Sequence, residues 1–193
     1  MKNHSIIADI LPSLPERQIL LHVCCAPCCG YIIEQLLTAG CQLTVLFYNP
    51  NIYPEAECSR RKEEVTRFAR KKSIPCVDLD YDPEAWRQMI RGLENEPERG
   101  KRCAQCFLLR LAKTADYAAR HNFKVFATSL GISRWKDLTQ VNTAGQQAAT
   151  RHPGLTFADV NWRANDGFNK SIALARRENF YRQNYCGCEF SRR

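Results

Sequence analysis

The sequence of 193 residues contains no long apolar run. A membrane-spanning helix needs roughly 18 apolar residues in succession. The longest apolar stretches here, residues 19–23 and 43–48, are only long enough to form strands. The first dozen residues, which include His4 and Asp9, also lack the basic and then apolar grading of a secretion signal. We therefore expect a protein that works in the cytoplasm without contacting a membrane.

The sequence also lacks nucleotide-binding motifs, internal repeats and low-complexity linkers. Neither the G-x-x-x-x-G-K-[ST] phosphate loop nor the Ser-Gly-Gly turn of ATP pyrophosphatases is present, so we do not expect the protein to use ATP. With 45% apolar and 25% charged residues, the chain has an ordinary globular composition and can bury a core. We expect residues 1–193 to form a single α/β domain.

Short apolar runs alternate with longer segments of helical period along the chain. We expect strands at residues 18–23, 42–48, 76–79, 124–128 and 155–160. We expect helices at residues 28–39, 54–72, 103–121, 137–150 and 167–181. This alternation predicts an open, doubly wound, mostly parallel sheet, because a barrel would need about 250 residues. Residues 82–101 are expected to form an excursion before the third long helix, and residues 182–193 a C-terminal arm.

The charge balance favours a polyanionic partner. Lys and Arg outnumber Asp and Glu by 28 to 20, which gives a net charge of +8 and a pI near 9.0. Basic and aromatic residues interleave near the C-terminus and flank the cysteine motifs: Arg60, Arg61, Lys62, Arg99, Lys101, Arg102, Arg176, Arg177, Phe180, Tyr181, Arg182, Tyr185, Phe190, Arg192 and Arg193. Such a mixture suits RNA with unstacked bases, although a solvated basic surface explains it equally well.

Eleven cysteines are many for a protein of this size, and in a reducing compartment they indicate metal ligands or redox thiols. Cys24, Cys25, Cys28 and Cys29 lie together where the first predicted strand ends and its helix begins. In open α/β sheets, ligands bind at the carboxyl ends of the strands near the topological switch point. We therefore expect a metal site there. The isolated Cys41, Cys58 and Cys76 are expected to be small core residues, and His22 to be a hydrogen-bonded core histidine.

Cys103 and Cys106 form a C-x-x-C motif at the start of the third long helix. Their side chains share one helix face, and the amides and dipole of the first turn favour the thiolate form. On this helix we expect Arg110 at the surface. The motif alone fits a zinc half-site, an iron–sulfur half-site or a redox pair. Together with the cysteine-rich turn it predicts a four-thiolate site, for which the spacing does not separate zinc from iron–sulfur.

Cys186 and Cys188 flank one glycine close to the C-terminus. A disulfide between them would close a very small ring and be readily reducible, as in a redox-active pair. The alternative is a disordered tail with two incidental thiols.

Six segments, taken together, resemble the QueH-type epoxyqueuosine reductases. They are LLHVCCAPC (20–28), FYNPNIYP (47–54), RRKEE (60–64), RCAQCFLLRL (102–111), ATSLGISRWKD (127–137) and RQNYCGC (182–188). The resemblance spans nearly the whole chain in the family's order, and the combination of the three cysteine motifs is more specific than any one of them.

This resemblance implies a cobalamin-independent enzyme that removes the epoxide oxygen of epoxyqueuosine in the tRNA anticodon loop, the last step of queuosine biosynthesis. It implies a fold similar to the adenine-nucleotide α-hydrolase type. It places a [4Fe–4S] cluster on Cys24, Cys25, Cys103 and Cys106. It also places a redox-active disulfide on Cys186 and Cys188. Cys28 occupies the position where some members hold an additional adjacent iron, so it is a further candidate ligand.

Removing an epoxide oxygen consumes two electrons and two protons, and ordinary side chains need a redox centre for this chemistry. We expect iron to act as that centre and as a Lewis acid, with the Cys186 and Cys188 pair relaying electrons from a donor that the sequence does not identify. Tyr48, Lys136 and Asp137 are candidate proton donors.

Two other functions use the same cysteines. One is a zinc-stapled nucleic-acid-binding module without catalysis, and the other is a thiol oxidoreductase with Cys103 and Cys106 as its redox pair.

Overall fold

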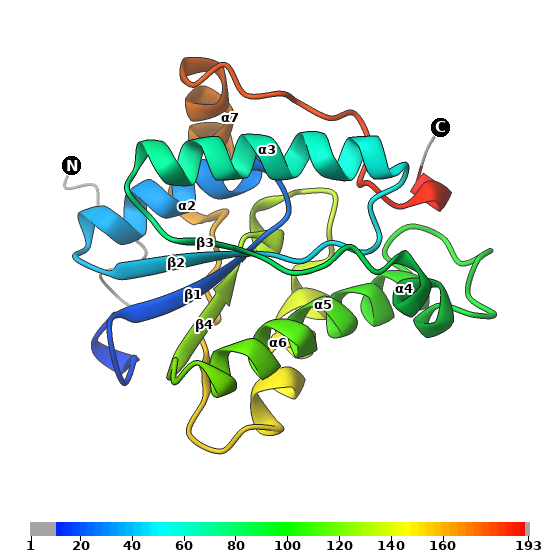
Figure 1. The fold of residues 1–193 in the computed structure, drawn as a ribbon, viewed down its shortest axis with the longest axis horizontal. Coiled ribbons are helices and arrows are strands. Elements are labelled where there is room, and N and C mark those ends of the chain that lie inside the picture. The colour runs from blue at the N-terminus through cyan, green and yellow to red at the C-terminus, as the bar shows by residue number, and fades with distance from the viewer. Residues whose placement is uncertain (1–10, 192–193) are drawn as a thin grey trace.

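Five parallel strands form the centre of the structure, a computed structural model that describes residues 11–191. They are β1 (Gln18–Val23), β2 (Gln42–Phe47), β3 (Cys76–Asp78), β4 (Val125–Thr128) and β5 (Thr156–Phe157). Their order in the sheet is β3-β2-β1-β4-β5, so the chain moves outward from β1 on one side and returns to its other side at β4 (Figure 1). The predicted doubly wound parallel sheet is confirmed, and its switch point lies between β1 and β4.

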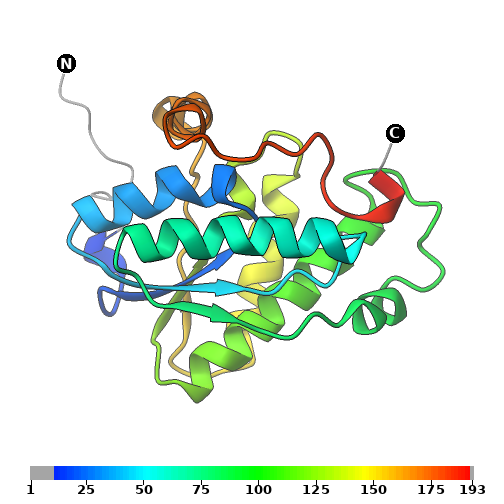
Figure 2. The same ribbon diagram turned by 45° about the horizontal axis from the view of Figure 1, so that its top comes forward.

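Helices cover both faces of this sheet (Figures 1 and 2). One face carries α2 (Ala26–Thr38), α3 (Glu55–Lys71) and α7 (Gly167–Arg177), and the other carries α5 (Lys101–Arg120) and α6 (Leu138–Thr150). Alternate residues of β1 serve the two faces: Leu21 and Val23 pack with α2, whereas Leu20 packs with α5. A strand that is buried on both faces has apolar residues at consecutive positions. The sequence therefore predicts β1 with its observed bounds.

The structure differs most from the predicted elements in two places. The excursion at residues 82–101 contains a further helix, α4 (Pro83–Met89), whose N-cap Asp82 accepts a hydrogen bond of 3.0 Å from the Ala85 amide. The fifth strand is only two residues long. Beyond it, the Trp162 indole donates to the Thr128 carbonyl at 3.0 Å, so the chain crosses the carboxyl end of β4 instead of continuing beside it.

Some sequence predictions concern residues outside this description. His4, Asp9, Arg192 and Arg193 lie outside residues 11–191. Within that range no helix combines the length and the apolar character needed to cross a membrane.

Candidate metal centre

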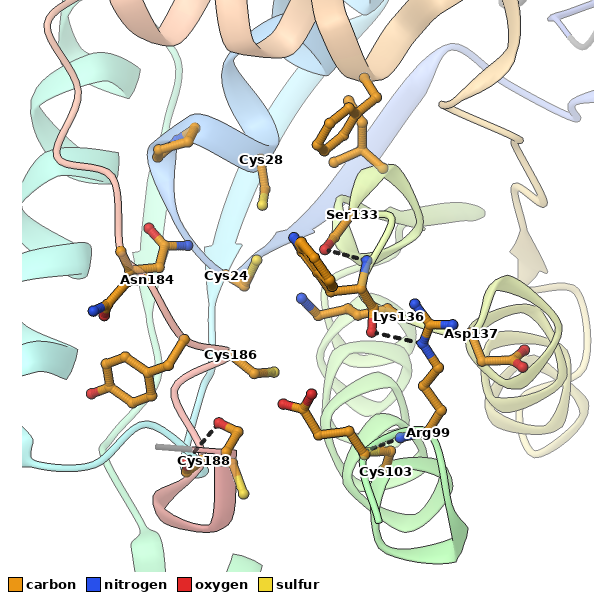
Figure 3. A pocket seen from close by; sticks show the side chains of 18 of the residues that line it. Cys24, Cys28, Arg99, Cys103, Ser133, Lys136, Asp137, Asn184, Cys186 and Cys188 are labelled. Carbon is orange, nitrogen blue, oxygen red and sulfur yellow. Dashed lines mark hydrogen bonds between the residues drawn. The ribbon is translucent and has the colours of Figure 1, made fainter. Parts of the chain in front are cut away.

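A pocket of about 670 Å³ opens at the carboxyl ends of the central strands, beside the switch point (Figure 3). Its walls come from the turn between β1 and α2, the start of α5, the loop after β4, helix α7 and the C-terminal arm. The predicted site and the observed pocket therefore coincide. Cys24, Cys28, Cys103, Cys186 and Cys188 all line it.

Three of the predicted site cysteines come together on one wall. The sulfur atoms of Cys24, Cys25 and Cys28 lie within 4.8 Å of one another, and those of Cys24 and Cys25 are 3.7 Å apart. Cys24 and Cys25 follow directly after β1, and Pro27 stands in the first turn of α2. The helix therefore returns the Cys28 side chain to the two sulfurs that precede it. We refer to these three residues as the cysteine triad.

Hydrogen bonds couple the three thiols of the triad. Hydrogen bonds from Cys25 and Cys28, together with the positive charges of Lys136 and Arg110, hold the pKa of Cys24 well below its ordinary value. The hydrogen bond with Cys24 raises the pKa of Cys25 to about 12, and the bonds with Cys24 and Cys25 raise that of Cys28. These hydrogen bonds favour the deprotonated form of Cys24 and the protonated forms of Cys25 and Cys28.

Two cations lie close to the triad in the protein interior. Lys136 is buried in the pocket wall, and Figure 3 shows its side chain reaching toward Cys24 and Cys186 from the opposite side. Arg110 on α5 is only 1% exposed and donates a hydrogen bond to the side-chain oxygen of Asn49. The expectation that Arg110 lies at the surface is wrong, because its helix position faces the carboxyl end of β1 instead of solvent.

The second predicted ligand pair is not part of the triad, and of its two members only Cys103 lines the pocket. Cys103 lines the same pocket and accepts a hydrogen bond of 3.3 Å from the Arg99 amide. Cys106 is buried in a small cluster with Trp86 and Cys188. Burial raises the pKa of both Cys103 and Cys106, so the prediction that the helix terminus favours thiolates there is wrong. Desolvation outweighs the helix dipole at these two positions.

The C-terminal arm forms part of the pocket wall. The side-chain amide of Gln183 donates to the Cys25 sulfur at 2.9 Å. Gly187 between the two arm cysteines has a φ of 121°, and a Cβ atom there would lie 2.9 Å from Ile52. Cys186 and Cys188 are free thiols in this structure, as are all other cysteines of the chain.

Several basic and aromatic residues predicted to contact RNA are instead buried. Arg61 is 2% exposed and donates to the carbonyl of Cys186 at 3.0 Å, and Arg102 is 3% exposed. Phe180 is also buried, in edge-on contact with Phe68. For Arg61, Arg102 and Phe180 the prediction of an RNA contact is wrong, because these side chains are buried in contacts within the protein.

The proposed proton donors differ in their access to the pocket. Tyr48 is buried in the core beside α5 and does not line the pocket. Asp137 lines it, but its carboxylate caps α6 by accepting from the Gln140 amide at 3.0 Å. Lys136 is therefore the remaining candidate whose charged group faces the triad.

His22 is a core residue, as predicted. Its ring nitrogens lie 2.9 Å from the Thr128 hydroxyl and 3.1 Å from the Tyr48 carbonyl, and burial lowers its pKa to about 3. It is therefore neutral at physiological pH.

Sequence reasoning did not assign site roles to Arg110, Gln183 or Trp135. Trp135 lines the pocket and is exposed. An indole between Arg134 and Lys136 was the available signal for an exposed position. No comparable signal exists for Arg110 or Gln183, because their roles depend on contacts between distant segments.

Comparisons with known proteins agree with the geometry. The profile of the family described as epoxyqueuosine reductase QueH matches residues 19–193. A protein named epoxyqueuosine reductase QueH from Acinetobacter baylyi is 49% identical over 182 residues, which cover 93% of this chain and 84% of that protein. One of the same name from Haemophilus influenzae is 49% identical over 182 residues, covering 93% and 74%. One from Streptococcus pyogenes is 37% identical over 179 residues, covering 90% and 69%.

Among solved structures, the U34-tRNA thiolase NcsA from Methanococcus maripaludis with its [4Fe–4S] cluster matches with a TM-score of 0.60. The match covers 98% of this chain and 66% of that one at 11% identity, so it shows a shared fold.

Proposed function

Because this chain belongs to the epoxyqueuosine reductase QueH family, we propose that it converts epoxyqueuosine to queuosine in the anticodon loop of tRNA, the last step of queuosine biosynthesis. The reaction takes up two electrons and two protons. Both carbon–oxygen bonds of the epoxide break, a carbon–carbon double bond forms, and the oxygen leaves as water. The observation that carries the proposal is the convergence of thiols from three distant segments on one pocket at the switch point.

We propose that Cys24, Cys25, Cys103 and Cys106 hold a [4Fe–4S] cluster, with Cys28 as the ligand of an additional adjacent iron. The donor set fits: thiolates are the ligands of such clusters. Two buried cations, Arg110 and Lys136, face these thiols and balance an anionic group. When bound, the cluster supplies a redox centre that can pass electrons to the substrate.

Cys186 and Cys188 are proposed to relay electrons. In the relay the dithiol becomes a disulfide, releasing two electrons and two protons, which is the amount that the reaction consumes. A donor of electrons then reduces the disulfide again. The position of both thiols in the pocket wall, opposite Cys103, supports this role.

Lys136 is proposed to bind the epoxide oxygen. Burial opposes its charge, but the negative charge of neighbouring cysteine thiolates, Cys186 and Cys24 first, raises its pKa above the ordinary value and favours the ammonium form. An ammonium aimed into a buried pocket stabilises the negative charge that develops on the departing oxygen. Arg163 donates to the carbonyls of Ser133 and of Lys136 itself, which fixes the loop that carries the lysine.

The direct test is conversion of tRNA that contains epoxyqueuosine. The tRNA is incubated anaerobically with iron-loaded protein and dithionite, then digested, and its nucleosides are identified by mass spectrometry. We expect loss of one oxygen atom from epoxyqueuosine with wild type and with Cys41→Ala, and no conversion with Cys24→Ala. Unchanged epoxyqueuosine in the presence of fully loaded wild type would contradict the proposal.

A further inference from the structure

One tryptophan differs from the other two in its exposure. Trp86 and Trp162 are each 2% exposed, whereas Trp135 is 75% exposed. Trp135 also lines the pocket that holds the cysteine triad. An exposed indole leaves a large flat apolar surface in water, and at the mouth of a binding pocket such a surface indicates contact with a ligand.

Two arginines hold the backbone of the loop that carries Trp135. Arg99 donates to the carbonyl of Trp135 at 3.3 Å and to that of Arg134 at 2.8 Å. Arg163 donates to the carbonyls of Ser133 and Lys136 at 2.5 and 2.7 Å. The indole is therefore presented on fixed backbone, which lowers the entropy cost when a ligand stacks on it.

The surroundings of the indole are cationic. Arg99 and Arg182 line the pocket and are exposed, and Arg134 is exposed next to Trp135 in the chain, with its guanidinium 4.3 Å from the centre of the Phe168 ring. Exposed aromatic rings among arginines are the typical surface for single-stranded nucleic acid, because the rings stack on bases while the cations contact phosphates. A surface for an apolar protein partner would not need this positive rim.

We propose that Trp135 is a stacking platform for an unpaired base next to the nucleoside that enters the pocket. The inference rests on the proposed function, because it takes an RNA loop as the substrate. A nucleoside that leaves its loop to reach the pocket loses stacking with its neighbours. The indole at the pocket mouth takes the place of that lost stacking partner and holds the loop in register with the triad.

The test measures binding of a labelled anticodon stem-loop RNA to the iron-loaded protein. Trp135→Ala should weaken binding roughly 5- to 100-fold, the range for loss of one base stacked on an aromatic ring. Trp135→Phe should retain most of the affinity. Met89→Ala, which removes another exposed apolar side chain that does not line the pocket, is the matched control and should bind like wild type. Equal affinity of Trp135→Ala and wild type would overturn the proposal.

A second RNA series identifies the base. Abasic nucleotides are placed one at a time on either side of the substrate position. At one of them the difference between wild type and Trp135→Ala should vanish, because no base remains to stack on the indole. A difference that persists with every abasic RNA would overturn the stacking role.

Iodide quenching gives an independent signal. Trp86 and Trp162 are buried, so the iodide-accessible fluorescence of the protein comes from Trp135 and should be protected when the RNA binds.

The experiments distinguish failure of the stacking proposal from failure of the proposed function. Wild type that converts epoxyqueuosine while Trp135→Ala binds normally contradicts only the platform, whereas Trp135-dependent binding without conversion contradicts only the reductase function.

Discussion

At the residue scale, the pocket pairs buried thiols with buried cations. Charged groups enter a protein interior at a large cost unless an opposite charge compensates them. Lys136 and Arg110 both lower the pKa of Cys24 through their charge, after the hydrogen bonds from Cys25 and Cys28. The cations and the thiols therefore form one electrostatic unit, and the effect of each should be measurable separately.

The proposed ligands can be tested through bound iron. Cys24→Ala, Cys25→Ala, Cys103→Ala and Cys106→Ala should each lose most of the iron, because a methyl group does not replace a thiolate ligand. Cys41→Ala, in the core beneath α2, should keep its iron and serve as the control. The measurement is iron per protein after anaerobic reconstitution. Normal iron content in all four ligand variants would refute the assignment.

Arg110 should influence the reduction potential of the proposed cluster. Arg110→Met removes a nearby positive charge and so disfavours the more negative, reduced state. We expect a midpoint potential lower by roughly 50 mV or more in anaerobic spectroelectrochemistry. Arg120→Met, an exposed position at the far end of α5, is the control. An unchanged potential in Arg110→Met would show that this charge is not coupled to the cluster.

The sequence predicts the roles of some site residues but not of others. Clustered cysteines at a strand end are readable, because small thiols are rarely used in numbers to fill a turn. The roles of Arg61 and Arg110 could not be predicted from the sequence, because an arginine in a helical segment gives no sign that its side chain points inward. Arg61 bonds to the Cys186 carbonyl, 125 positions away in the chain, and only the folded structure shows that pairing.

At the scale of elements, helix α3 anchors the C-terminal arm. Arg61 binds Glu57 at 2.7 Å, and the Tyr181 hydroxyl donates to the same carboxylate at 3.0 Å. The Glu64 carboxylate accepts from the Tyr181 amide at 2.8 Å. The Tyr53 amide donates to the Gly187 carbonyl at 2.8 Å. The pair of arm cysteines is thus held on a fixed backbone.

A variant of the arm separates relay from ligation. Cys188→Ser should keep wild-type iron content and RNA affinity, because Cys188 is not a proposed ligand, but repeated turnover should collapse. A chemically reduced sample should still complete a single turnover. Steady-state conversion of epoxyqueuosine, measured alongside iron content, gives the answer. Full multiple turnover by Cys188→Ser would exclude the relay.

A carboxylate on α2 links three elements and predicts a pH effect. Partial burial raises the pKa of Glu34, but hydrogen bonds from Arg177 and Lys72 outweigh it and hold this pKa below the ordinary value. A lowered pKa stabilises the folded state above the unfolded pKa of about 4.3, and this contribution disappears as the pH falls through the folded pKa.

Glu34→Gln should therefore lower the free energy of unfolding at pH 7 by about 0.5–1 kcal/mol. The difference from wild type should shrink below about pH 4. Anaerobic urea unfolding followed by circular dichroism measures both values, with the exposed Glu63→Gln on α3 as the control. A difference that does not change with pH would contradict the charge-based explanation.

The sequence predicted those helices and strands whose apolar periodicity is strong. It missed the short helix, in which the apolar pattern covers too few residues. The five strands and five long helices follow from apolar spacing alone. Helix α4 spans only Pro83–Met89 and lacks a long apolar stripe, although Asp82 followed by Pro83 is a readable start signal. The early end of α7 depends on Asn179, whose φ of 52° stops the helix before Tyr181.

At the scale of the whole molecule, the order of the strands in the sheet brings the segments of the site together. Because β1 and β4 are neighbours, the turn after β1 and the loop after β4 meet at one edge, and α5 and the arm complete the walls. The predicted fold therefore located the pocket, but not its open volume or its exposed tryptophan. These depend on how loops pack, which apolar periodicity does not encode.

The composition of wild-type protein purified without oxygen tests the central claim that this pocket holds an iron–sulfur cluster. We expect a coloured protein with visible absorption and with iron and acid-labile sulfide in near-equal amounts, because thiolate-bound clusters absorb visible light. The colour should be lost in Cys24→Ala. A colourless wild type that contains zinc, or thiols without metal, would contradict the account and favour a zinc-stapled binding module or a thiol oxidoreductase.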